Sequence, residues 1–184
     1  GHALNAVLLL HGTGGQGASF TRGEFPQILM SPGGLLDPAK YFIIMPDGIG
    51  HGSSSKPSDG LRMHFPKYDY DDMVKAEHAL VTEGLHIDHL RLILGTSMGC
   101  MQAFMWGEMW PDITPALMPL ACNARPIVGR NRLWREMGIL AIKADPAWMG
   151  GDYTSEPIAG LTADAMALSL AGSAPLRMQE DLST

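Results

Sequence analysis

The chain has 184 residues, of which 46% are hydrophobic and 17% are charged, and its formal net charge at pH 7 is −6. This composition is typical of a soluble globular protein with one sizeable core and excludes a disordered chain. The acidic balance argues against nucleic-acid binding, and no apolar stretch approaches the roughly 18 residues that a membrane helix needs.

Short apolar runs predict the strands of a buried sheet. They lie at residues 6–10, 41–45, 90–94 and 116–121. Helical patterns at residues 69–83 and 100–109 separate the later runs. Strands that alternate with helices predict a mostly parallel sheet covered by helices, an α/β fold.

The pattern changes after Asn123, because no further strand is predicted. Apolar residues recur at helical spacing over 133–144 and again over 161–170. We therefore divide the chain into a core, residues 1–123, and a helical insertion or lid, residues 124–184.

The loop after the first strand, His11–Gly17, fits two different motifs. Its G-x-G-x-x-G is the phosphate-binding fingerprint of dinucleotide enzymes, which needs a helix that starts within the glycines and an acid about 20 residues further on. The stretch that follows shows no helical pattern, and Asp47, the acid that ends the next strand, comes 35 residues after Gly12. A His-Gly pair after a strand is also where acyl-transferring enzymes form half of an oxyanion hole, and we favour this interpretation.

The third apolar run ends in Gly95-Thr96-Ser97-Met98-Gly99, a G-x-S-x-G between a predicted strand and a predicted helix. A serine in such a turn projects its hydroxyl out of the sheet at the positive end of the helix, and the flanking glycines let strand and helix approach. We predict that Ser97 is a nucleophile. The backbone N–H groups of Met98 and Thr13 are the predicted oxyanion donors, and His11 and Gly12 are expected to contact substrate.

These residues resemble the α/β-hydrolase superfamily, and within it the homoserine O-acetyltransferase-like branch. The resemblance is carried by NAVLLLHGTGG, DGIGHGSSSKP, LRLILGTSMGCMQAFMWGEMWPD and ADPAWMGGDY. It implies an α/β-hydrolase fold with a helical lid. It also implies a Ser-His-Asp triad that takes an acyl group onto serine and passes it to an alcohol or to water.

In that family two further strands precede the one at residue 6, and the triad's aspartate and histidine follow the lid. The chain therefore looks like the central segment of a larger protein, and we expect a companion chain or a longer parent to supply the rest of the fold. His11 belongs to the oxyanion loop and His51 to the turn after the second strand. We expect these and the other histidines within the chain to be structural or solvated rather than catalytic.

No metal site is predicted. His86, Asp88 and His89 are too close together in a loop to ligate one ion well. The two cysteines, Cys100 and Cys122, make neither a disulfide framework nor a metal pattern.

The lid sequence bears on the substrate. In the family a lid helix carries a Glu-x-x-Arg pattern whose arginine holds an amino-acid carboxylate, and here Ile139 stands in the arginine's place. We expect Ile139, with Trp134 and Met137, to favour an apolar acyl or alcohol group. The nearby arginines at 130, 132 and 135 are expected to lie on a solvated helix face.

The sequence thus predicts a serine acyl-enzyme catalyst that hydrolyses a small ester with no cofactor. One alternative is acyl transfer from acetyl-CoA to an amino-acid hydroxyl, and another is a non-catalytic binding protein with this fold. The expected partners are a small ester or acyl donor, with no nucleic acid and no membrane. The sequence does not distinguish a cytoplasmic from a periplasmic location.

Overall fold

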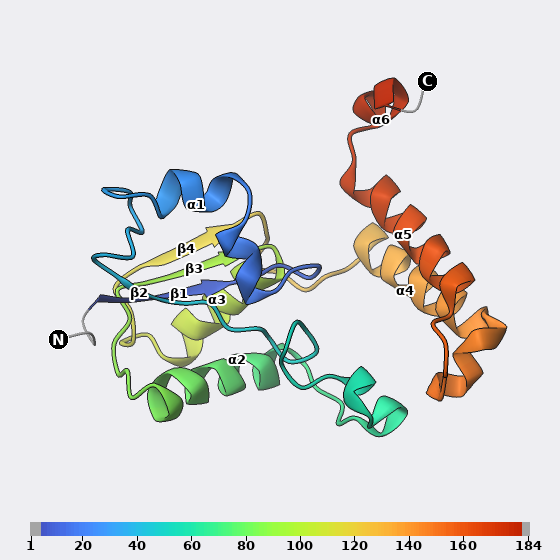
Figure 1. The fold of residues 1–184 in the computed structure, drawn as a ribbon, viewed down its shortest axis with the longest axis horizontal. Helices are drawn as coiled ribbons and strands as arrows, with labels where there is room; N and C mark the ends of the chain where they lie inside the picture. Colours follow the sequence, from blue (N-terminus) through green and yellow to red (C-terminus); the bar gives the residue numbers. More distant parts are fainter. Residues whose placement is uncertain (1–4, 182–184) are drawn as a thin grey trace. The chain divides into compact units, whose positions relative to one another are not determined.

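The structure of the chain is a computed structural model that describes residues 5–181. The chain divides into two compact units, Gly1–Ala124 and Arg125–Thr184. The strands of the described residues all lie in the first unit, and the second unit is helical (Figure 1).

The first unit is built on a parallel sheet. Its strands are β1 (Ala6–Leu10), β2 (Phe42–Ile44), β3 (Leu92–Thr96) and β4 (Leu117–Leu120). They pair in the order β2-β1-β3-β4, and every pairing is parallel. The expected α/β-hydrolase fold, a parallel sheet covered by helices, is confirmed. All five residues of β1 are buried, because this strand is internal and both of its faces are covered.

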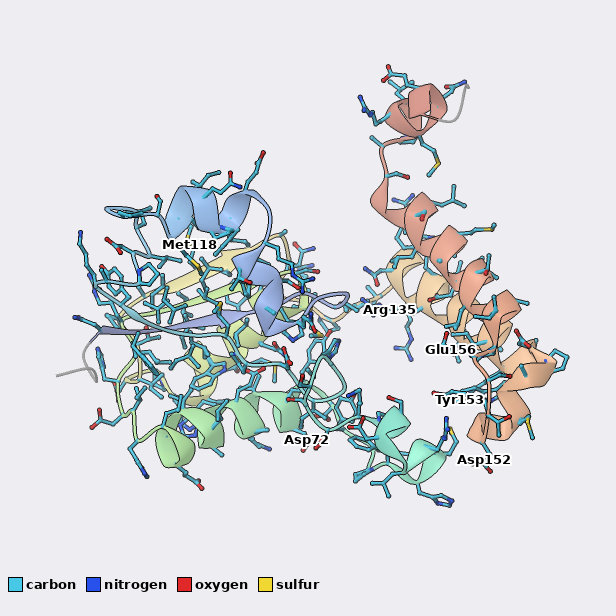
Figure 2. All side chains as sticks on the ribbon, viewed as in Figure 1. Asp72, Met118, Arg135, Asp152, Tyr153 and Glu156 are labelled. Atoms are coloured by element: carbon cyan, nitrogen blue, oxygen red, sulfur yellow. A yellow bond between two sulfur atoms is a disulfide. The ribbon has the colours of Figure 1, made fainter. Side chains whose placement is uncertain are left out.

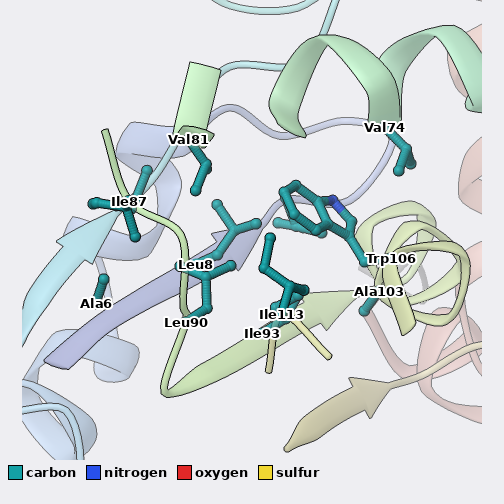
Figure 3. Packing of buried hydrophobic residues seen from close by; sticks show 12 residues of the cluster. Ala6, Leu8, Val74, Val81, Ile87, Leu90, Ile93, Ala103, Trp106 and Ile113 are labelled. Carbon is teal, nitrogen blue, oxygen red and sulfur yellow. The ribbon is translucent and has the colours of Figure 1, made fainter. Parts of the chain in front are cut away.

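Two apolar clusters hold helices against the two faces of the sheet. On one face, Leu8 and Ile93 pack with Trp106 of α3 (Met98–Met109) and Val74 of α2 (Tyr70–Ala79), as Figure 3 shows. The other face carries the alternate residues of the same strands. It packs Val7, Leu9 and Leu94 against Phe20 of the 3-10 helix η2 (Gly17–Thr21) and the apolar side of α1 (Glu24–Leu29).

The structure corrects the expectation that no helix follows the first glycine-rich loop. Helices η2 and α1 occupy that stretch, although Gly23 and Pro26 interrupt its pattern. Pro26 is tolerated because it lies in the first turn of α1, where backbone N–H groups have no partner within the helix. Gly23 precedes the helix with φ of 66°, a backbone conformation that glycine adopts readily.

Other boundaries shift by a few residues. Helix α2 ends at Ala79 and continues into one π-helical turn, η5 (Leu80–Gly84). Strand β4 lies at an edge of the sheet, and its Met118 and Leu120 are exposed. Its residues are therefore less buried than those of the internal strands.

The two cysteines form a disulfide, which the sequence pattern did not predict. Cys100 lies in the first turn of α3 and Cys122 follows β4, with 5.9 Å between their Cα atoms. They meet because β4 pairs in parallel with β3, so the end of β4 comes beside the start of the helix that follows β3. A separation of 22 residues in the sequence gives no sign of this contact.

The second unit is a pair of packed helices with short additions. It contains α4 (Arg130–Ala144), the 3-10 segment η6 (Pro146–Gly151), α5 (Ile158–Gly172) and α6 (Pro175–Asp181). Asp145 ties these parts together, because its carboxylate accepts the N–H of Ala147 and the N–H of Gly160, each at 2.9 Å. That this unit is a lid remains a prediction. Across residues 5–181, no helix has the length and apolar character needed to cross a membrane.

Candidate active site

Ser97 occupies the turn between β3 and α3 in an unusual backbone conformation. Its φ is 53° and its ψ is −110°, and its side chain is exposed while Met98 and Gly99 are buried. Residues other than glycine rarely adopt a positive φ, and such strain concentrates at functional sites. The Ser97 N–H donates to the carbonyl of Leu120 at 2.9 Å, which fixes the turn against the end of β4.

The glycines of the G-x-S-x-G motif allow backbones to pack together here. A Cβ atom on Gly95 would collide with the carbonyl of Gly99, and one on Gly99 would collide with the carbonyl of Leu10. The Gly99 N–H also donates to the carbonyl of His11 at 3.0 Å. The start of α3 is thus joined directly to the end of β1.

The loop after β1 lies against the serine. A Cβ atom on Gly12 would stand 3.3 Å from the Ser97 Cβ, so the glycine lets the loop approach the elbow closely. Met98 is the first residue of α3, and its N–H has no carbonyl one turn earlier in the helix to bond. The structure therefore brings Ser97, Met98, His11, Gly12 and Thr13 to the carboxyl ends of the paired strands β1 and β3.

The His11 ring is buried, and both of its nitrogens face backbone groups. Nδ1 lies 2.8 Å from the carbonyl of Gly12, and Nε2 accepts the N–H of Gly48 at 3.0 Å. This pattern fits a neutral imidazole with its proton on Nδ1. Burial lowers the pKa of His11, which also favours the neutral form. The ring thus supports the loop from within the protein, and its contact with substrate remains a prediction.

The loop after β2 braces the loop after β1, a role that the sequence alone did not reveal. The Asp47 carboxylate accepts the N–H of Ser53 and the N–H of Gly17, each at 2.7 Å, and so joins the two loops. The Ser53 hydrogen bond is the largest cause that holds the Asp47 pKa below its usual value. The sequence feature that could have indicated this role is an acid directly after a buried strand and before the glycine-rich run at 48–52.

Histidines of the first unit are engaged with other groups. His51 places Nε2 3.0 Å from the carbonyl of Thr13 and Nδ1 3.1 Å from that of Ile49. His78 stacks on Trp110, with 3.8 Å between the ring centroids. Within residues 5–181, no group of three or more His, Cys, Asp or Glu side chains could hold a metal ion.

The predicted lid residues all lie on α4 in the second unit. Met137 and Ile139 are about half exposed, and because a helix turns by about 100° per residue they lie on opposite sides of α4. Arg135 precedes Ile139 by one turn and shares its side. The Arg135 Nε donates to the Asn131 side chain at 2.9 Å, and Figure 2 labels this arginine. Trp134 is half-buried on the same helix.

The chain is similar to proteins of known activity. A family model for the alpha/beta hydrolase fold matches residues 5–157. Ethyl acetate hydrolase from Pseudomonas veronii is 36% identical over 163 residues, which cover 85% of this chain and 46% of that protein. Homoserine O-acetyltransferase from Chlorobaculum parvum is 36% identical over 178 residues, covering 88% of this chain and 47% of that protein.

A solved structure of an esterase has a similar fold. The acetyl esterase MekB superposes with a TM-score of 0.83 at 34% identity, covering 94% of this chain and 50% of that one. The chain thus spans about half the length of the relatives that it matches. The names of these relatives, esterases and O-acetyltransferases, support an enzyme.

Proposed function

Because the chain belongs to the α/β-hydrolase family, we propose that Ser97 is the nucleophile of an enzyme that hydrolyses a small ester. The observation that carries this proposal is the exposed Ser97 itself, held at φ 53° and ψ −110° between a buried strand and a helix. A strained, exposed serine in that turn is the arrangement that presents a nucleophile in enzymes of this fold.

In this mechanism the Ser97 Oγ attacks the ester carbonyl carbon, and a histidine takes the Oγ proton. The carbonyl oxygen becomes negative and accepts hydrogen bonds from the N–H groups of Met98 and Thr13. When the tetrahedral intermediate collapses, the alcohol leaves with the proton from the imidazolium, and the acyl group stays on Ser97. The same histidine then deprotonates a water, which attacks the acyl-enzyme, releases the carboxylic acid and regenerates the serine.

We place the catalytic histidine and its aspartate outside this 184-residue segment, in the rest of the parent protein. The engaged rings of His11, His51 and His78 support this placement, because each already binds a backbone group or stacks on an aromatic ring.

Hydrolysis is our first choice of net reaction, and acyl transfer to an amino-acid hydroxyl is the alternative. Ile139 supports hydrolysis, because a neutral side chain cannot pair with the carboxylate of an amino-acid acceptor. The similarity to homoserine O-acetyltransferases keeps transfer, with acetyl-CoA as donor, as the second candidate.

The test uses the full-length protein and a fluorophosphonate probe, which reacts with activated serines. We expect the probe to label Ser97, and we expect Ser97→Ala to lose both labelling and esterase turnover. Loss of a nucleophile that acts within a triad lowers kcat by about 10⁶-fold.

Ser58→Ala is the matched control, because Ser58 is an exposed serine of the same unit outside the site. This variant should keep full labelling and turnover. Labelling of another serine, or near-normal turnover by Ser97→Ala, would show that the assignment is wrong. An unmodified protein with neither labelling nor turnover would favour a non-catalytic role for this fold.

A further inference from the structure

The proposed donor, the Thr13 N–H, shares a peptide group with the Gly12 carbonyl, and that carbonyl is held by hydrogen bonds. The Gly12 carbonyl accepts from the His11 Nδ1 at 2.8 Å and from the Gly15 N–H at 2.9 Å. The N–H and C=O of one planar trans peptide point in opposite directions. Fixing the Gly12 carbonyl therefore fixes the direction of the Thr13 N–H.

The next peptide group, between Thr13 and Gly14, is held by a different loop. Its carbonyl lies 3.0 Å from the Nε2 of His51. A neutral imidazole has one N–H, and we assign it to Nε2, so the Nδ1 of His51 makes no hydrogen bond to the carbonyl of Ile49, 3.1 Å away. The loop that carries His51 is itself joined to the first loop through Asp47.

The Thr13–Gly14 peptide lies at the exposed tip of the loop. Thr13 and Gly14 are exposed, and a Cβ atom on Gly14 would meet no heavy atom within 4 Å. Glycine has wide conformational freedom, and this loop has four glycines between residues 12 and 17. The His51 contact is therefore a restraint from another loop on the Thr13–Gly14 peptide, beside those that hold the Gly12–Thr13 peptide.

We infer that His51 is a positioning residue, which holds Thr13 so that its N–H points at the oxyanion of the reaction. This inference rests on the proposed function. His51 does not touch the reacting atoms, and it acts through the carbonyl of Thr13. The two histidines thus have complementary roles, because His11 fixes the peptide group before Thr13 and His51 fixes the one after it.

The expected effect on kcat and KM follows from the state of the reaction in which the Thr13 N–H donates its hydrogen bond. An oxyanion donor binds the transition state more strongly than the substrate, so its loss lowers kcat and leaves KM nearly unchanged. Complete loss of such a donor costs about 10²- to 10³-fold in kcat. A donor that is present but poorly held should cost less, and we expect about a tenfold loss.

The experiment compares two variants of His51 in the full-length protein. His51→Leu removes the donor to Thr13, whereas the amide nitrogen of His51→Gln can reach the position of Nε2 and donate in its place. Hydrolysis of p-nitrophenyl acetate gives kcat and KM, and fluorophosphonate labelling of Ser97 gives the concentration of active sites. His64→Leu, an exposed histidine of the same unit, is the control and should behave as the unmodified protein.

We expect His51→Leu to lower kcat per labelled site about tenfold with KM within twofold, and His51→Gln to restore most of the loss. An unchanged kcat per site in His51→Leu would overturn the inference, and so would a Gln variant as slow as the Leu variant. A rise confined to KM would also overturn it, and would instead identify His51 as a substrate contact. If Ser97 of the unmodified protein is not labelled, the proposed function itself fails.

Discussion

Glu77 is a buried carboxyl group that the proposed mechanism does not use. Its side chain on α2 is only 6% exposed, and it accepts the indole N–H of Trp106 at 3.2 Å. Burial disfavours the charged form and raises the pKa of Glu77 to about 7, although the Trp106 hydrogen bond opposes the shift. The protonation of Glu77 therefore bears on the stability of the fold.

The raised pKa predicts a loss of stability as the pH rises. Its value of about 7 in the folded protein is above the ordinary 4.5, so the folded state binds the proton more tightly. The resulting stabilisation is complete below pH 4.5 and is lost as the pH rises through 7, by at most about 3 kcal/mol. Glu77→Gln is neutral at every pH and keeps an acceptor for Trp106. We expect it to be more stable than the unmodified protein at pH 8 and similar near pH 5.

Urea unfolding of the full-length protein at several pH values measures this difference. Glu108→Gln, an exposed substitution on α3, controls for the change in net charge. A stability difference between Glu77→Gln and the unmodified protein that stays constant from pH 5 to 8 would contradict the prediction.

The residues of the site differ in how far the sequence reveals them. Ser97 and its flanking glycines can be predicted, because a local motif between a strand and a helix defines the turn. The contacts of Asp47 and His51 could not be predicted, because they join loops that are 30 and 38 residues apart in the sequence. Such contacts depend on the pairing of β1 with β2, which no local pattern specifies.

At the scale of elements, the disulfide joins the helix that begins at the proposed nucleophile to the end of β4. Cys100 is buried in α3 and Cys122 is half-buried. Two residues before Cys122, the Leu120 carbonyl accepts the N–H of Ser97. A bridge across about 20 residues stabilises a fold by about 3 kcal/mol, chiefly because it restricts the unfolded chain.

We therefore predict that Cys122→Ser lowers the free energy of unfolding by about 3 kcal/mol. This variant leaves a buried thiol at Cys100, which behaves as a small apolar group. Thermal unfolding with and without dithiothreitol provides the measurement. The reductant should lower the Tm of the unmodified protein to that of Cys122→Ser, and it should leave the variant unchanged. Two free thiols in the unmodified protein, denatured without reductant, would count against the disulfide.

Some helices and strands can be predicted from the local sequence, whereas others depend on contacts between distant residues. The strands could be predicted because their apolar runs are short and bounded by turn residues. Helix α1 was missed because its Pro26 interrupts the local pattern, and the packing of Phe25 and Leu29 against the sheet offsets that disadvantage. Tertiary packing thus determines whether a segment with a weak helical pattern forms a helix, whereas segments with a strong pattern can be predicted from the sequence.

At the scale of the whole molecule, the first unit has apolar surface beside its edge strand. An apolar hollow of about 270 Å³ lies on the α1 side of the sheet, lined by residues that include Leu29, Leu92 and Met118. Met118, labelled in Figure 2, is 42% exposed on β4.

Because the chain spans about half the length of its relatives, activity is best measured on the full-length protein.

The choice between hydrolysis and acyl transfer is a property of that whole protein, and we expect it to depend on α4. Without a bidentate arginine, a bound amino-acid carboxylate lacks its charge-assisted partner, and such a loss costs about 2–5 kcal/mol, mostly because the carboxylate stays buried and unpaired. This energy corresponds to roughly 30- to several-thousand-fold in selectivity. We therefore expect kcat/KM for short-chain aryl or alkyl esters to exceed kcat/KM for acetylation of homoserine from acetyl-CoA, both measured on one preparation.

Two variants at residue 139 separate charge from shape. Ile139→Arg should raise homoserine acetylation relative to ester hydrolysis, whereas the size-matched Ile139→Leu should leave the ratio nearly unchanged. The opposite preference in the unmodified protein would require another cation on the same side of α4. Arg135 is one such cation, because it lies one turn before Ile139 on the same helix. In that case Arg135→Leu should abolish acetylation, and the hydrolase assignment would be abandoned for the transferase.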